Sequence, residues 1–133
     1  MNGLVADTHA VLWFLANESR LSAVADAAMT ETIESGGNVV VCTITLVEVA
    51  YLVEKRRIDA NAFDLVATAL SDPTSGFLLA PLDYSVADRL RQIPRVSVPD
   101  MPDRIIAATA LHLDLPLISR DRKIQASAIR TIW

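Results

Sequence analysis

The sequence has one cysteine and no long hydrophobic run, and each shortage excludes a class of protein. Cys42 alone cannot form an internal disulfide, and with only two histidines the chain lacks the close Cys/His spacing of a zinc site. No apolar run reaches the ~18 residues that span a bilayer, and the first residues lack the basic region and cleavage site of a signal peptide. We therefore expect a cytoplasmic protein with no membrane segment, in which oxygen atoms hold any metal ion. Cys42, at the end of the apolar run 39–42, is expected to be a buried core thiol.

Aromatic residues are also scarce, at 5% of the chain, although 52% of all residues are hydrophobic and 21% are charged. The apolar content, and the mean hydropathy of +0.35, therefore come mainly from Ala, Leu, Ile and Val. Such a composition is typical of elements that are buried on both sides. At 133 residues the chain is close to the commonest domain size, and we expect one domain over residues 1–133.

Basic residues are almost absent from the first part of the chain. Residues 1–54 carry seven acids and one base, Arg20, for a charge of −6, whereas residues 55–133 carry nine acids and eleven bases, for a charge of +2; the two values sum to the net −4. An acidic chain with a basic second part is compatible with a partner that carries phosphates, such as nucleic acid. For any one basic cluster taken alone, a solvated helix end, where bases complement the helix dipole, is the favoured explanation.

Short apolar runs alternate with longer segments of helical composition. Residues 38–42 are mostly β-branched and uncharged, which is typical of a parallel strand covered on both faces. The runs expected to form strands are 4–6, 38–42, 77–82, 115–119 and 129–133. The segments expected to form helices are 9–15, 22–35, 46–57, 58–70, 84–93 and 102–110. This alternation predicts an α/β fold with a parallel sheet and right-handed crossovers.

Four acids each lie at or just after an apolar run, or on the helix that follows one: Asp7, Glu48, Asp103 and Asp121. The carboxyl ends of parallel strands meet at one edge of a sheet, where open α/β folds bind their ligands. We therefore expect the four carboxylates to converge at that edge. Helix capping explains any one of them taken alone, and either Asp100 or Asp103 suits the first turn of a helix that begins near Pro102.

Converging carboxylates repel one another unless a cation neutralises them. Mg²⁺ and Mn²⁺ prefer such oxygen ligands and commonly take further ligands from a substrate phosphate. An ion of this kind polarises a phosphodiester and lowers the pKa of a bound water molecule for in-line attack. The four acids therefore predict metal-dependent phosphodiester hydrolysis.

Four stretches resemble the acidic motifs of PIN-domain ribonucleases, and the most similar type is the VapC toxin of bacterial and archaeal toxin–antitoxin pairs. In chain order they are Leu4–Trp13, Thr43–Ala50, Pro102–Ala110 and Leu117–Asp121. They occur in the order of the family and cover nearly the whole chain.

The resemblance implies an endoribonuclease that acts as a toxin and uses Mg²⁺, for which Mn²⁺ may substitute, with a metal-activated water as nucleophile. It implies that Asp7, Glu48, Asp103 and Asp121 are the catalytic, metal-binding quartet. It further implies that Thr8 and Ser119 are supporting hydroxyls and that Arg104 and Arg120 contact the RNA backbone. The family commonly has threonine in place of Ser119 and often asparagine in place of Arg120. Neither His9 nor Asp100 receives a role.

For the fold, the resemblance implies a three-layer α/β/α, PIN-like arrangement with a five-stranded parallel sheet. It also implies a homodimer and an antitoxin protein whose peptide lies in a groove and blocks the site. The substrates it implies are structured RNAs, above all transfer or ribosomal RNA.

Two alternatives are compatible with an acidic pocket in a small α/β domain. A receiver-like signalling module requires paired acids after the first strand and a phospho-accepting aspartate after the third. Here a lone Asp7 precedes Thr8, and Asp83 is an ambiguous acceptor. The second alternative is a catalytically silent PIN-like binding module, which the presence of all four acids disfavours.

Overall fold

The computed structural model describes residues 2–133, in which five parallel strands form one sheet in the order β3-β2-β1-β4-β5. The strands are β1 (Gly3–Ala6), β2 (Asn38–Cys42), β3 (Phe77–Ala80), β4 (Leu117–Ile118) and β5 (Thr131–Ile132). Because β1 is the central strand, the residue that follows it, Asp7, lies at the middle of the carboxyl edge. The predicted parallel α/β fold is confirmed.

Seven α-helices and one 3-10 turn accompany the sheet in the described part of the chain. They are α1 (Thr8–Leu15), α2 (Ala23–Glu34), α3 (Thr43–Glu54), α4 (Ala62–Ser71), α5 (Tyr84–Arg89), η1 (Leu90–Gln92), α6 (Met101–Leu113) and α7 (Arg122–Gln125). None of the helices within residues 2–133 is long and apolar enough to cross a membrane.

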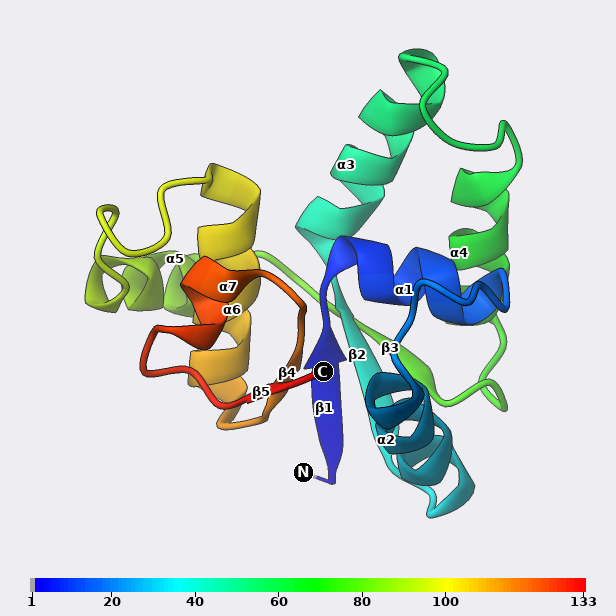
Figure 1. Cartoon of the computed structure of the whole chain (residues 1–133), viewed down its shortest axis with the longest axis horizontal. Coiled ribbons are helices and arrows are strands. Elements are labelled where there is room, and N and C mark those ends of the chain that lie inside the picture. Colours follow the sequence, from blue (N-terminus) through cyan, green and yellow to red (C-terminus); the bar gives the residue numbers. More distant parts are fainter. Residues whose placement is uncertain (1) are drawn as a thin grey trace.

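Two apolar cores, one on each face of the sheet, account for the three layers. Successive side chains of a strand point to opposite faces. Leu4 and Ala6 accordingly pack with α1 to α4, whereas Val5 packs with α5 to α7. Figure 1 shows α5, α6 and α7 on one side of β1 and α1 to α4 on the other. Cys42 belongs to the second core, where burial raises the pKa of its thiol to about 11, and the expectation of a core thiol is confirmed.

Side-chain caps start several of the helices where the sequence predicts them. Ser22 accepts the Ala25 N–H at the start of α2, and Asp100 accepts the Asp103 N–H at the start of α6. Pro102 lies in the first turn of α6, where the missing proline N–H costs no hydrogen bond.

Several element boundaries differ from those predicted. The expected helix 58–70 begins only at Ala62, because the Asp59 carboxylate accepts the Asn61 N–H and residues 58–61 form a turn. The expected helix 84–93 divides into α5 and η1. The strands expected over 77–82, 115–119 and 129–133 are shorter. The four-residue helix α7 was not expected, because four residues carry no periodic pattern.

Candidate active site

The carboxylate of Asp7 is held at the junction of β1 and α1. Its Oδ1 accepts the Ala10 N–H at 2.9 Å, which starts α1. Burial raises the pKa of Asp7, while hydrogen bonds from the Ala10 N–H and from Ser119 oppose that rise. The nearby carboxylate of Asp121 raises the same pKa further. Asp7 is therefore both a helix cap and a member of a group of interacting acids.

Glu48 joins this group through a pair of threonines. The Thr8 hydroxyl donates to Glu48 Oε1 at 2.5 Å and lies 3.1 Å from the hydroxyl of Thr45, which is fully buried. Burial raises the pKa of Glu48, and the bond from Thr8 lowers it. Thr45 precedes Glu48 by three residues, so both face the same side of α3. Thr8 was expected as a supporting hydroxyl, whereas sequence reasoning gave Thr45 no such role.

Ser119 supports the acids at the other side of β1. Its hydroxyl is buried, accepts the Asp121 N–H at 3.1 Å and is close enough to the Asp7 carboxylate to lower the pKa of Asp7. Asp121 in turn caps α7, accepting the N–H groups of Lys123 at 2.8 Å and Ile124 at 3.3 Å. The short helix α7 therefore holds Asp121 beside the end of β4.

Asp103 interacts with three other acids: Asp100 at the start of the same helix, and Asp121 and Glu48 from other parts of the chain. Its pKa rises to about 7, first through burial and then through the neighbouring carboxylates of Asp100, Asp121 and Glu48. Asp100 is also near enough to raise the pKa of Glu48. The structure thus brings the four predicted acids together and adds Asp100, which the sequence suggested only as a cap.

The donor set fits a hard divalent cation. It consists of carboxylate and hydroxyl oxygens, and burial, followed by the neighbouring like charges, raises the pKa of Asp103 to about 7. Within residues 2–133, however, no three His, Cys, Asp or Glu side chains are arranged as a preformed metal site. The carboxylates are close enough to perturb one another without forming a closed cage.

The two candidate RNA-contacting arginines lie in different surroundings. Arg104 donates to the carbonyl oxygens of Ile93 at 2.8 and 3.2 Å and of Leu90 at 3.1 Å. This favours a structural role for Arg104 over the predicted RNA contact. Arg120 forms no salt bridge in the described chain, and its guanidinium carbon lies 4.7 Å from the centre of the Trp13 ring.

Trp13 is a site-adjacent residue that sequence reasoning missed. Its ring is 5% exposed and contacts Arg20, whose guanidinium carbon lies 5.0 Å from the ring centre, as well as Arg120. The His9 ring lies 5.3 Å away, and His9 is near enough to Asp7 and Glu48 to oppose the rise in pKa of both. The only signal in the sequence was the i, i+4 spacing of His9 and Trp13.

The chain belongs to the PIN-domain family, because the family model matches residues 4–129. It is similar to Ribonuclease VapC22 of Mycobacterium tuberculosis (strain ATCC 25618 / H37Rv), with 29% identity over 126 residues that cover 95% of this chain and 92% of that protein. The resemblance to PIN-domain ribonucleases is thereby confirmed, and a receiver-like module is excluded. Asp83, the acceptor considered for that alternative, caps α5 by accepting the Val86 N–H at 3.0 Å.

Three solved structures share the fold. The structure of VapBC2 from Rickettsia felis bound to a promoter DNA fragment aligns with a TM-score of 0.71 at 12% identity, covering 97% of this chain and 96% of that one. A toxin–antitoxin complex from Klebsiella pneumoniae aligns with a TM-score of 0.68 at 23% identity, and the alignment covers 98% of this chain and 96% of that one. FitAcB from Neisseria gonorrhoeae aligns with a TM-score of 0.62 at 19% identity, and the alignment covers 96% of this chain and 95% of that one. The predicted three-layer, five-stranded PIN-like fold is confirmed.

Proposed function

We propose that this protein is a metal-dependent endoribonuclease and the toxin of a toxin–antitoxin pair. The observation that carries the proposal is Asp103, whose pKa is raised to about 7 by burial and by Asp100, Asp121 and Glu48 at the carboxyl edge of a PIN-domain sheet. The name of the relative, Ribonuclease VapC22, supports RNA as the substrate. The family match over residues 4–129 supports one PIN domain over 1–133.

Asp7, Glu48, Asp103 and Asp121 would hold Mg²⁺ or Mn²⁺. When bound, the ion supplies the Lewis acid that polarises the phosphodiester and activates a water molecule. The chain's own residues orient the ligands: the Thr8 hydroxyl fixes one oxygen of Glu48, and Ser119 positions both Asp7 and Asp121. The apolar helix α6 mounts Asp103 at the edge of the sheet. Arg120, free of ion pairs within residues 2–133, would contact the RNA backbone.

RNA cleavage with Asp103→Asn tests this proposal. We expect the purified protein to cut RNA only with Mg²⁺ or Mn²⁺, and Asp103→Asn to lower the rate by about 100-fold or more, because the site loses a charged ligand. Asp114→Asn is the matched control, since Asp114 ends the same helix, has an exposed side chain and adopts the left-handed conformation that asparagine tolerates. An undiminished rate in Asp103→Asn would refute the assignment. Mn²⁺ binding without cleavage of any RNA would favour a silent binding module.

The partner is proposed to be an antitoxin protein, with the toxin as a homodimer. The toxin–antitoxin complex from Klebsiella pneumoniae shares the fold of this chain, which supports that partner. Expression is expected to arrest growth, Asp7→Ala to relieve the arrest, and co-expression of a small adjacent reading frame to do the same. Arrest that persists with Asp7→Ala would contradict the proposal. Mapping cleavage sites in total RNA would test transfer and ribosomal RNA as the targets.

A further inference from the structure

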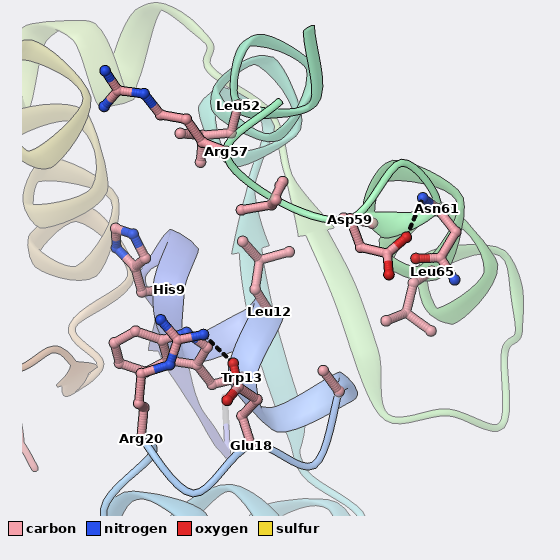
Figure 2. Close-up of a pocket in the computed structure, with 13 residues that line it drawn as sticks. His9, Leu12, Trp13, Glu18, Arg20, Leu52, Arg57, Asp59, Asn61 and Leu65 are labelled. Carbon is pink, nitrogen blue, oxygen red and sulfur yellow. Dashed lines mark hydrogen bonds and ion pairs between the residues drawn. The ribbon is translucent and has the colours of Figure 1, made fainter. Parts of the chain in front are cut away.

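A cavity of about 560 Å³ lies between α1 and the segment that joins α3 to α4. Its apolar wall includes Leu12, Leu52 and Leu65, and its polar wall includes His9, Arg20 and Arg57. Figure 2 shows the Arg20 guanidinium in front of Trp13, with His9 and Arg57 projecting to the same side of the cavity. A space of this size accommodates one nucleotide.

The cavity lies one helical turn from the acidic site, along the same faces of α1 and α3. Thr8 and Leu12 are four residues apart on α1, and Glu48 and Leu52 are four residues apart on α3, so each pair lies on one helix face. One helical turn advances ~5.4 Å, and a nucleic-acid strand carries a phosphate every ~3.4 Å of duplex axis. A strand whose scissile phosphate lies at the carboxylates therefore reaches the cavity within about one or two nucleotides.

The wall carries two arginines, Arg20 and Arg57, and two acids, Glu18 and Asp59. Asp59 lies on the side of the cavity away from His9 and Arg57, where its carboxylate accepts the Asn61 N–H (Figure 2), so the side that faces the acidic site is the one that suits an anionic ligand. Arg57 has an exposed side chain and forms no salt bridge in the part of the chain that the structure describes. Arg20 pairs with Glu18 through one edge and lies over Trp13 with its plane, which leaves a flat cation against which a base can stack. A flat cation available for stacking, apolar side chains beside it and one arginine without a salt bridge, Arg57, are features that suit a single-stranded RNA nucleotide.

We propose that this cavity binds one nucleotide of the substrate RNA adjacent to the scissile phosphate. This inference rests on the proposed ribonuclease function and adds a subsite to it. The base enters between Leu12 and Leu52 and stacks on Arg20, while Arg57 and His9 contact the phosphate or sugar on the side of the acids. The subsite thus selects an unpaired nucleotide, because a base within a duplex cannot enter the cavity.

RNA binding without metal tests the charge of the subsite separately from catalysis. The protein is prepared with Asp103→Asn and bound to a fluorescent single-stranded RNA, and anisotropy is followed against salt concentration. Adding Arg57→Gln is expected to weaken binding by about tenfold and to lower the salt slope by about 0.7 to 1, the effect of one lost phosphate contact. Arg56→Gln, which removes the same charge from the neighbouring residue outside the cavity wall, is expected to change affinity by about twofold or less.

A second variant closes the cavity without changing charge. Ala16 is exposed at the end of α1 and lines the cavity, so Ala16→Trp fills the space from its rim. We expect this variant to lose RNA binding by about tenfold while its melting temperature and Mn²⁺ affinity stay those of the parent. Ala27→Trp, at an exposed position of α2 outside the cavity wall, is the control for a surface tryptophan.

The outcomes separate this subsite from the proposed function. If the wild-type protein cuts RNA and neither Arg57→Gln nor Ala16→Trp, each added to Asp103→Asn, changes RNA binding, the subsite is wrong and the ribonuclease assignment stands. If Ala16→Trp leaves RNA binding intact but blocks binding of a partner peptide, the cavity is a peptide site and the inference is overturned. If the wild-type protein does not cut RNA and the Asp103→Asn protein does not bind it, both the proposed function and the subsite are wrong.

Discussion

The hydroxyl of Thr8 donates a hydrogen bond of 2.5 Å to Glu48 Oε1, across forty residues of sequence. The same hydroxyl lies 3.1 Å from the buried hydroxyl of Thr45, so one side chain of α1 connects to two side chains of α3. This arrangement holds the Glu48 carboxylate in one orientation, at a position where burial raises its pKa and the Thr8 bond lowers it.

Thr8→Val is therefore expected to impair the site while preserving side-chain shape. The variant leaves the Glu48 oxygen and the Thr45 hydroxyl without their partner, which costs about 1–3 kcal/mol of unfolding free energy. Loss of an orienting partner of this kind typically reduces metal affinity or activity by about 10- to 100-fold. Titration calorimetry with Mn²⁺ measures the loss of metal affinity, and thermal unfolding measures the loss of stability. Thr8→Ser retains the donor and should remain near wild type; a Thr8→Ser loss equal to that of Thr8→Val would contradict this explanation.

The stability of the metal-free protein should fall as pH rises from about 4 to about 7. The pKa of Asp103 is raised to about 7 in the folded state, whereas an unfolded aspartate titrates near about 3.9. Between those values the folded state binds more protons than the unfolded state, so unfolding free energy decreases with pH, and it levels off above about 7. Burial raises the pKa of Asp7 and Glu48 in the same direction. Urea unfolding at several pH values measures the slope, and Asp103→Asn should reduce it; a stability that rises over this window would refute the expectation.

Binding of a divalent metal ion should restore the unfolding free energy that the metal-free protein loses as pH rises. Metal binding requires the carboxylates to be deprotonated, so affinity for Mg²⁺ or Mn²⁺ should increase with pH up to about 7, and binding should release protons. Saturation at about 100 times the dissociation constant stabilises the fold by about 2.7 kcal/mol, and a chelator should remove that gain. Melting temperature with and without Mn²⁺ provides the measurement. Asp103→Asn should lose the gain and Asp114→Asn should keep it; equal stabilisation of both variants would place the ion elsewhere.

Arg120→Lys should weaken RNA binding although it conserves charge. The Arg120 guanidinium lies over the Trp13 ring, and a lysine ammonium is neither planar nor a bidentate donor. We expect KM for RNA to rise several-fold with kcat little changed, together with a change in Trp13 fluorescence. Arg122→Lys, two residues away on α7, serves as the control. A fall in kcat at constant KM would indicate that Arg120 acts in the chemical step instead.

Gly3→Ala should disturb the site from a distance. A Cβ atom at Gly3 would lie 2.5 Å from the backbone oxygen of Asn38, so β1 must move away from β2. We expect a loss of about 1–3 kcal/mol in unfolding free energy and a loss of activity, since Asp7 directly follows the same strand. Gly36→Asn is the comparison, because Gly36 has open space around it and a φ of +82° that asparagine tolerates. Equal effects of the two substitutions would refute the steric argument.

Residues with local signals were predictable from the sequence. The uncharged run 38–42 forms a strand with the predicted bounds, and Asp7 follows the central strand as expected. The convergence of the four acids was predictable because the carboxyl ends of parallel strands meet at one edge of a sheet.

Contacts between distant segments were not predictable. The cation–π contact of Arg120 with Trp13 joins α1 to the segment after β4, and no spacing in the chain encodes it. The electrostatic influence of Asp100 on Glu48 likewise depends on how α6 packs beside α3. The start of α4 shifted because a side-chain turn at Asp59 competed with helix formation, which composition alone does not show.

The hydrogen bonds from Arg104 to Leu90 and Ile93 bear on how such a site changes during evolution. Arg104 is the residue next to Asp103, so these hydrogen bonds connect the first turn of α6 to Leu90, which begins η1, and to the buried Ile93, which follows it. We expect substitutions at Leu90 or Ile93 to change the orientation of α6, and with it that of the Asp103 side chain, while all four acids stay the same. Two homologues with identical quartets can therefore differ in metal affinity and rate.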